Sequence, residues 1–149
     1  MTLTNLCDQQ RLIGSIENEE GPVLLLVGGM HGNEPAGIAA IEASLELLKE
    51  LQPKIKGSIY AVKGNLKALE QSTRYIDLDF NRMWNKRFDV NQHIDTSEYD
   101  EYIKLKAIID RINIQKGNRP LIVLDLHTTS SDSLPFILCS QDPRNRRLV

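Results

Sequence analysis

A histidine and a glutamate stand three residues apart in the segment GGMHGNEPAG, residues 28–37. His31 and Glu34 follow the apolar run PVLLLVGG, 22–29, which predicts a buried parallel strand that ends at a tight turn. Sites of α/β folds form at the carboxyl ends of such strands, and zinc accepts imidazole and carboxylate ligands. The pair therefore indicates a metal site. The alternative is that HxxE is a chance pattern and that Glu34 only favours a helix N-terminus.

A second histidine, His127, ends the apolar run PLIVLDL, 120–126, in the segment LDLHTTSS. A neighbouring strand would bring it to the same edge of the sheet as a third ligand. Three protein ligands and one open position are typical of catalytic zinc, whereas structural zinc usually has four. Asp125 shares the strand face of His127 and is a candidate to support it. The alternative is a hydrogen-bonded histidine at a strand end.

The segment TRYIDLDFNRMW, 73–84, alternates polar or charged side chains with apolar ones. Arginine suits bidentate binding of a carboxylate, so Arg82 with Asn81 is a candidate clamp for a substrate carboxylate. Arg74 is a candidate to stabilise a developing oxyanion. The same alternation equally fits a solvated strand. His93 has no acidic or histidine partner at a metal-binding interval and is interpreted as a surface residue.

Regular elements must bring these segments together. Apolar residues at intervals of three and four predict a helix over 34–51, with Asn33 as its N-cap. The run GSIYAV, 57–62, predicts another strand. Residues 22–62 therefore indicate a β-α-β unit of a doubly wound α/β sheet.

A second helix is predicted over 98–116, ended by Gly117, before the strand at 120–126. No repeat or linker divides the chain, so we expect a single domain over 1–149. The ending PRNRRLV resembles the opening of another element, and a sheet of this kind needs cover on both faces. We therefore expect the natural protein to continue beyond this chain.

The composition narrows the classes of function. Lysine and arginine number 18 and aspartate and glutamate 20, so the net charge of −2 argues against nucleic acid or an anionic membrane as a partner. No apolar run approaches the roughly 18 residues of a membrane helix, and the N-terminus does not resemble a leader. We expect a cytoplasmic protein. The two cysteines lie far apart and predict neither a disulfide framework nor a thiolate metal site.

In this order, GGMHGNEP, RYIDLDFNR and DLHTTSS resemble the succinylglutamate desuccinylase and aspartoacylase family of zinc carboxypeptidase-like hydrolases, over roughly residues 20–140. The resemblance implies an α/β fold in which helices flank a mixed sheet. It implies an enzyme that uses one Zn²⁺ and a metal-activated water to cleave the amide bond of N-acyl amino acids. His31, Glu34 and His127 match the family's metal ligands.

The resemblance also implies roles for the segment 73–84. Arg74 matches the arginine that polarises the scissile carbonyl, whereas Asn81 and Arg82 match the pair that holds the substrate's carboxylate. Asp79 matches an acidic residue of the motif and is assigned to support of the site. The family's general base, a glutamate on a later strand, and its C-terminal β-rich region are not in this sequence. We therefore expect a partial catalytic domain that binds zinc and turns over poorly.

The implied substrates are small molecules like N-succinylglutamate or N-acetylaspartate. Two alternatives stay open. A zinc carboxypeptidase acting on peptides would use the same ligands and the same carboxylate clamp. A non-catalytic module that binds a metal or a small ligand would need no general base. Other divalent ions also accept histidine and carboxylate ligands, and the sequence leaves the acyl group, the preferred amino acid and the oligomeric state open.

Overall fold

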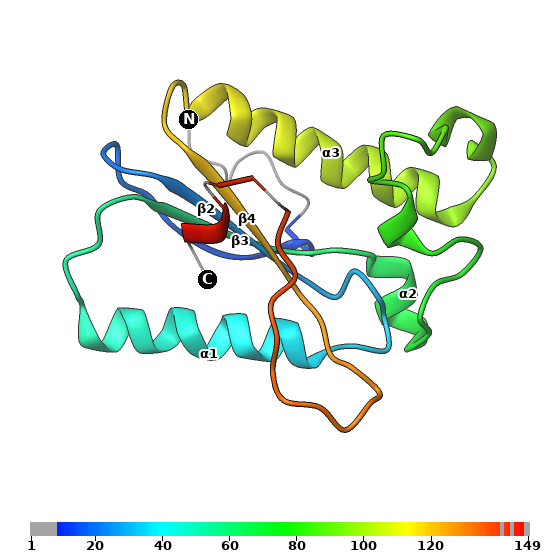
Figure 1. Cartoon of the computed structure of the whole chain (residues 1–149), viewed down its shortest axis with the longest axis horizontal. Helices are drawn as coiled ribbons and strands as arrows, with labels where there is room; N and C mark the ends of the chain where they lie inside the picture. The colour runs from blue at the N-terminus through cyan, green and yellow to red at the C-terminus, as the bar shows by residue number, and fades with distance from the viewer. Residues whose placement is uncertain (1–8, 141, 144, 148–149) are drawn as a thin grey trace.

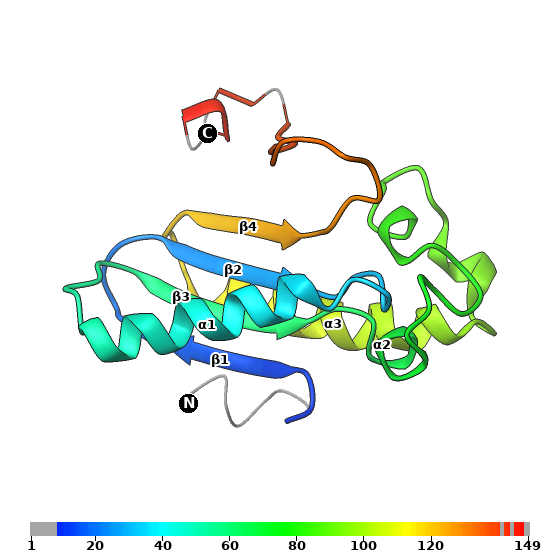
Figure 2. The same cartoon turned by 90° about the horizontal axis from the view of Figure 1, so that it is seen from below.

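In the computed structural model, four strands form one mixed sheet between two long helices (Figures 1 and 2). The structure describes residues 9–140, 142–143 and 145–147. Helices α1 and α3 cover opposite faces of the sheet, which confirms the predicted mixed sheet flanked by helices. The elements in chain order are β1 (Leu12–Ile16), β2 (Val23–Gly28), α1 (Ala36–Leu51), β3 (Ser58–Lys63), α2 (Leu66–Gln71), the 3-10 helices η2 (Phe80–Arg82) and η3 (Val90–His93), α3 (Ser97–Gln115), β4 (Leu121–Leu126) and the 3-10 helix η4 (Asn145–Arg147).

The central strand β2 pairs in parallel with both of its neighbours. The strands lie in the order β1-β3-β2-β4, and only β1 runs antiparallel to its partner, β3. Gly28, at the end of β2, stands opposite Lys63 on one side and Leu126 on the other. The segments that leave β2, β3 and β4 therefore emerge next to one another at one edge of the sheet.

Side chains of β2 alternate between two apolar layers. Val23, Leu25 and Val27 are buried in the cluster that contains Leu105 and Ile112 of α3. On the other face, Leu26 packs against the cluster formed by α1 and β3, whose buried members are Ile41, Leu45 and Ala61. Because helices cover both faces, β2 is apolar along its whole length, which explains the continuous run in the sequence.

The predicted start of the first helix was wrong. Helix α1 begins at Ala36, and Pro35 occupies the N-cap position without a side-chain capping bond, so Asn33 is not the cap. Asn33 lies in the turn between the two candidate ligands His31 and Glu34, and the backbone becomes helical only after that turn. The predicted C-terminal end of the second long helix is confirmed, because α3 stops at Gln115 and Gly117 follows with a φ of 56°.

The sequence did not predict β1 or α2. Strand β1 is a short edge strand with an irregular register between Leu12 and Gly14, and α2 has only six residues, too few for a helical apolar period. The alternating segment 73–84 is not a strand. It forms bends and then η2, and its Phe80 and Met83 are buried against α3 while neighbouring polar residues stay outside.

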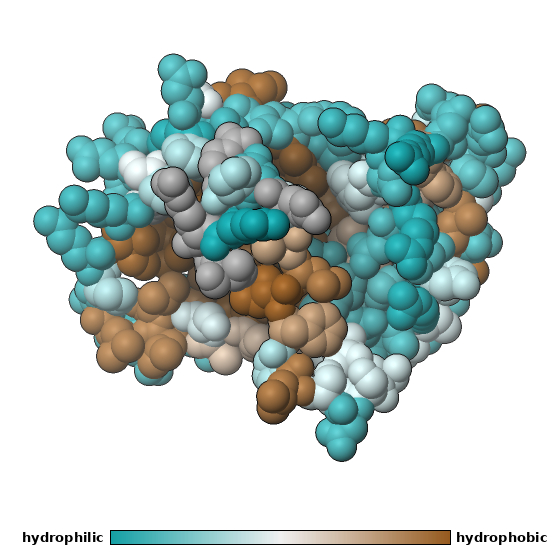
Figure 3. Space-filling model, in the orientation of Figure 1, coloured by the Kyte–Doolittle hydropathy of each residue, from teal (hydrophilic) through white to brown (hydrophobic). Residues whose placement is uncertain are grey.

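Apolar side chains also lie on the surface after β4. The run LPFILC has no regular secondary structure, and its Leu134, Phe136, Ile137 and Leu138 are exposed. Figure 3 shows apolar atoms over α1 and this segment, whereas the side of the molecule around α2 is hydrophilic. Among the described residues, no helix is long and apolar enough to cross a membrane.

The side chains that α1 packs on the sheet should contribute strongly to the free energy of unfolding. Ile41 is 1% exposed, so Ile41→Ala should lower the free energy of unfolding by about 2–5 kcal/mol through lost burial and a cavity. Leu47, 53% exposed on the same helix, is the matched control, and Leu47→Ala should change stability by about 0.5 kcal/mol or less. Urea unfolding of both variants measures this. Equal losses in the two variants would contradict the assigned face.

Candidate metal and substrate site

The turn after β2 carries the first two candidate ligands, and its glycines allow it to fold tightly. Gly29 has a φ of 74°, which glycine adopts without strain. Gly32 lies so close to α2 that a Cβ there would stand 2.0 Å from the carbonyl atoms of Ala68. Close packing of this turn on α2 therefore directs His31 and Glu34 back toward the edge of the sheet.

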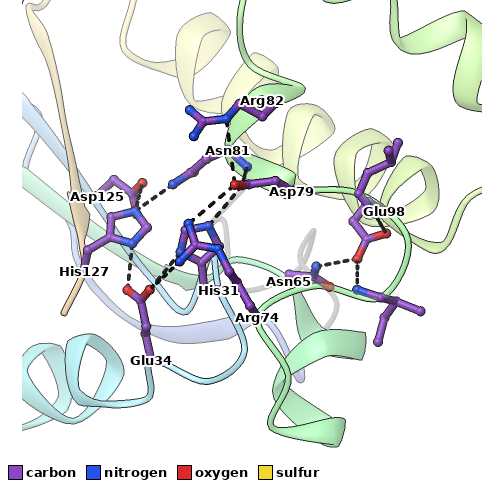
Figure 4. A network of polar contacts seen from close by, with 12 residues as sticks. His31, Glu34, Asn65, Arg74, Asp79, Asn81, Arg82, Glu98, Asp125 and His127 are labelled. Atoms are coloured by element: carbon purple, nitrogen blue, oxygen red, sulfur yellow. Dashed lines mark hydrogen bonds and ion pairs between the residues drawn. The ribbon is translucent and has the colours of Figure 1, made fainter. Parts of the chain in front are cut away.

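Three side chains from two neighbouring strand ends converge above that edge (Figure 4). Glu34 lies between the histidines, with Oε1 at 2.9 Å from Nδ1 of His31 and Oε2 at 2.8 Å from Nδ1 of His127. The two rings are 4.9 Å apart between centroids. Oε2 of Glu34 also accepts a hydrogen bond from the backbone N–H of Thr128 at 3.0 Å. The structure thus brings together the three predicted metal ligands.

The outer nitrogen of each histidine faces its own aspartate. Nε2 of His31 lies 3.1 Å from Oδ1 of Asp79, and Nε2 of His127 lies 2.7 Å from Oδ2 of Asp125. Asn81 also reaches Nε2 of His127, at 3.0 Å. A histidine that binds metal through one nitrogen commonly donates its other N–H to a carboxylate, which fixes the ring. Asp79 and Asp125 occupy the positions expected of such partners.

The donor set fits a divalent cation. Among the described residues, His31, Glu34 and His127 form the group of possible ligands whose atoms all lie within 4.8 Å of one another. Zinc with bonds of about 2.1 Å in tetrahedral geometry separates its ligand atoms by about 3.4 Å, so small side-chain rotations accommodate the ion. Two imidazoles and one carboxylate suit zinc. The cation would take the place of the direct contacts between Glu34 and the two rings.

The pKa values in the cluster reflect these contacts. Burial raises the pKa of Glu34, but hydrogen bonds from Thr128, His127 and His31 outweigh it and lower the value overall. The same opposition, with His31 as the main partner, lowers the pKa of Asp79. The hydrogen bond to Asp125 is the main cause that raises the pKa of His127 to about 9. Without a metal, His127 is therefore protonated at neutral pH, and metal binding there must release a proton.

The segment 73–84 brings its polar side chains to the same place. The guanidinium of Arg74 lies 3.7 Å from Glu34 and 3.5 Å from Asp79, and Nε of Arg82 lies 3.8 Å from the same aspartate. Arg74 is 49% and Arg82 71% exposed, so both keep free surface for a ligand. Asp79 caps η2 by accepting the N–H of Asn81 at 3.1 Å.

Other residues lie outside the cluster or were not predicted. His93 is in η3 and stacks on Phe88 with ring centroids 4.8 Å apart, away from the candidate ligands. The contact of the Thr128 backbone with Glu34 leaves no side-chain signal in a sequence. Glu98, at the start of α3, was interpreted only as a helix residue, yet it is buried and holds the turn that precedes Asp79. The burial of Glu98 marks it as a residue with a role in the site, and this burial follows from the fold and is not visible in the sequence.

This architecture is that of an α/β protein with a candidate metal and substrate site at the carboxyl ends of its parallel strands. A model of the succinylglutamate desuccinylase/aspartoacylase catalytic domain matches residues 20–149. The chain therefore belongs to the succinylglutamate desuccinylase/aspartoacylase family, as the three sequence motifs predicted.

Individual relatives agree with this assignment. The chain is 33% identical over 119 residues to a probable aspartoacylase of Nostoc sp., covering 79% of this chain and 39% of the relative. It is 29% identical over 116 residues to a succinylglutamate desuccinylase of Pseudomonas paraeruginosa, covering 78% of this chain and 33% of the relative. The chain thus spans about a third to two fifths of the length of these relatives.

Solved structures share the fold. The succinylglutamate desuccinylase of Chromobacterium violaceum superposes with a TM-score of 0.61 at 25% identity, over 72% of this chain and 33% of that protein. The enzyme of Vibrio cholerae gives a TM-score of 0.60 at 16% identity, over 72% of this chain and 30% of that protein. The second likeness concerns the fold alone.

The three histidines of the sequence provide a direct test of the cluster. We expect the chain to bind one zinc ion, and His31→Ala or His127→Ala to weaken zinc binding at least about a hundredfold through loss of a direct ligand. His93→Ala is the matched control and should bind as the unchanged chain does. Calorimetric titration with zinc and elemental analysis after dialysis measure this. Loss of zinc in His93→Ala, or retention in the other two, would refute the assignment.

Proposed function

We propose that this chain carries the zinc-binding and substrate-binding part of an amidohydrolase that deacylates N-acyl amino acids. The observation that carries the proposal is the convergence of two kinds of group at one sheet edge. His31, Glu34 and His127 form a metal-type cluster, and Arg74 and Arg82 lie beside it with exposed guanidinium groups. Membership of the desuccinylase and aspartoacylase family supports the same reaction class.

In this proposal the chain's own side chains hold and orient the metal. Nδ1 of both histidines and the carboxylate of Glu34 point inward, while Asp79 and Asp125 accept the outer N–H groups and fix the rings. When bound, zinc supplies Lewis acidity, which polarises a carbonyl oxygen and lowers the pKa of a water molecule. The backbone N–H of Thr128 donates to Glu34 and helps to hold its carboxylate between the two histidines.

The arginines and Asn81 bind the substrate in this proposal. Arg74 donates to Asp79 at 3.5 Å and lies 3.7 Å from Glu34, and its half-exposed guanidinium keeps further N–H donors for the oxygen of the scissile carbonyl. Arg82 stands further out, where a planar guanidinium with five donors suits the free carboxylate of an amino acid. A substrate held between the two would place its amide at the metal cluster.

The proposed reaction also needs a general base. Within the part of the chain that the structure describes, the carboxylates in contact with the cluster's histidines are those of Glu34, Asp79 and Asp125. Glu34 contacts both histidines, and each aspartate contacts one. A general base that takes a proton from water needs a carboxylate without such a commitment. In keeping with the domain prediction, we propose that residues 1–149 form part of a catalytic domain and that another segment supplies the base.

Removal of Arg82 should weaken substrate binding in a carboxylate-dependent way. For the zinc-loaded chain, we expect Arg82→Ala to raise the Kd of an N-acetyl amino acid about tenfold, since a hydrogen bond to a charged group is worth about 1.5 kcal/mol or more. In a complete enzyme the same change would raise KM. Arg82→Ala should not change the Kd of the matching N-acetyl amino acid amide, in which an uncharged amide replaces the carboxylate. Arg87→Ala, at an exposed arginine three residues after the segment 73–84, is the matched control.

Calorimetry or NMR titration measures these constants. Equal affinity of Arg82→Ala and the unchanged chain for the carboxylate ligand would remove the assigned role of Arg82.

Turnover by the zinc-loaded 149-residue chain should be absent or slow, because no carboxylate among the described residues contacts the cluster without already binding a histidine. Release of free amine from N-acyl amino acids and from short peptides, assayed side by side, measures this. Clear hydrolysis that disappears in His127→Ala would contradict the proposal and would mean that another residue acts as base. Cleavage of peptides in preference to N-acyl amino acids would instead favour a carboxypeptidase.

A further inference from the structure

Glu98, in the first turn of α3, is a buried carboxylate outside the metal cluster, with an exposed fraction of 0%. Its Oε1 accepts hydrogen bonds from the N–H of Ile76 at 2.7 Å and from Nδ2 of Asn65 at 3.1 Å. Its Oε2 accepts from the N–H groups of Asp77 and Leu78 at 3.0 and 3.1 Å. Four donors thus satisfy a group whose burial would otherwise be costly.

The three backbone donors require a particular chain path. In an extended strand, successive N–H groups point to opposite sides, so three consecutive ones cannot meet at a single carboxylate. Residues 76–78 therefore curl around Glu98 and form bends. This contact explains why the alternating segment 73–84, whose pattern also fits a strand, turns toward the metal cluster instead.

Neighbouring contacts join the same turn to the rest of the site. Asp77, within this turn, also binds the start of α3, because its Oδ2 accepts a hydrogen bond from the N–H of Ser97 at 2.7 Å. Asn65 donates to Glu98 and also caps α2 by accepting the N–H of Ala68 at 3.1 Å. Figure 4 shows Asn65 and Glu98 to the right of Arg74 and Asp79, with His127 on the opposite side of the view. The turn is thus bound to α2 and α3 at one junction.

The metal-ligand turn is linked to this segment as well. The N–H of Gly32 donates to the carbonyl of Arg74 at 3.3 Å, just before the turn that Glu98 holds. Asp79, just after that turn, contacts His31. The turn at 76–78 therefore sets how Arg74 and the η2 residues face the metal cluster.

We propose that Glu98 is a positioning residue for substrate binding: by curling residues 76–78, it directs Arg74 on one side and Asp79 to Arg82 on the other toward the metal cluster. This role rests on the proposed function above. All four hydrogen bonds that Glu98 accepts come from segments other than those of His31, Glu34 and His127. Its loss should therefore impair substrate binding while the metal ligands stay in place.

Amide hydrogen exchange of residues 76–78 in the metal-free chain tests the anchoring alone. Glu98→Gln keeps the side-chain size but replaces an acceptor oxygen by a donor, so these amides should exchange about tenfold faster or more. Asp100→Asn, on the same turn of α3 but exposed and paired with Lys67 at 3.0 Å, is the matched control and should change nothing. Equal exchange in Glu98→Gln and the unchanged chain would overturn the anchoring.

Ligand titration tests the role in substrate binding. With zinc and an N-acetyl amino acid as probes, Glu98→Gln should still bind one zinc ion but bind the acyl amino acid about tenfold more weakly. Adding Arg82→Ala to Glu98→Gln should then weaken binding little further, because the loss of Glu98 has already displaced Arg82. Unchanged affinity in Glu98→Gln, or losses that simply add, would overturn the positioning role. A purely structural effect would lower stability and give additive losses.

Failure of the unchanged chain to bind the acyl amino acid would refute the proposed function and with it this role, while the exchange data would still report the anchoring. If Glu98→Gln does not fold, Asp77→Ala provides the test from the exposed side of the junction, since it removes the bond to Ser97. It should raise both the exchange rates at 76–78 and the Kd. Unchanged values for both would overturn the proposal.

Discussion

The parallel pairing of β2 with β4 is the constraint on which the site depends. The two strands are in register from Val23 opposite Leu121 to Gly28 opposite Leu126, so the segments that follow them start side by side. His127 and Glu34 are 93 residues apart in the sequence, yet Nδ1 of His127 lies 2.8 Å from Oε2 of Glu34. Any change of register would move His127 along the edge and separate the ligands.

Electrostatics explains why so many charged groups are tolerated together. Three carboxylates surround two imidazoles, and two guanidinium groups lie around Asp79. Hydrogen bonds and opposite charges keep the pKa values of Glu34 and Asp79 low despite partial burial, and they raise that of His127. A cation at the centre of this cluster would be held by Glu34 and the two rings, while Asp79 and Asp125 stay on the outer nitrogens of the rings. This arrangement is the physical basis of the proposed zinc site.

Buried acids of α3 support the outer part of the site. Glu98 binds the turn before Asp79, and Glu101, one helical turn further on, pairs with the buried Arg11 at 2.5 Å and accepts the N–H of Leu66 at 2.9 Å. Glu98 and Glu101 are almost completely buried, and each accepts at least two hydrogen bonds. Helix α3 therefore contributes an apolar face to the core and, at its beginning, polar anchors for α2 and for the substrate-binding segment.

The sequence by itself determined the local chemistry: the ligand types, the arginine-rich motif, the central strands and the two long helices follow from residue type and period. It did not determine β1 or α2, because an edge strand and a six-residue helix have little periodicity of their own. It left the segment 73–84 undecided between strand and site. Only the tertiary structure decided this, because the buried Glu98, distant in sequence, collects its backbone donors and turns it toward the metal cluster.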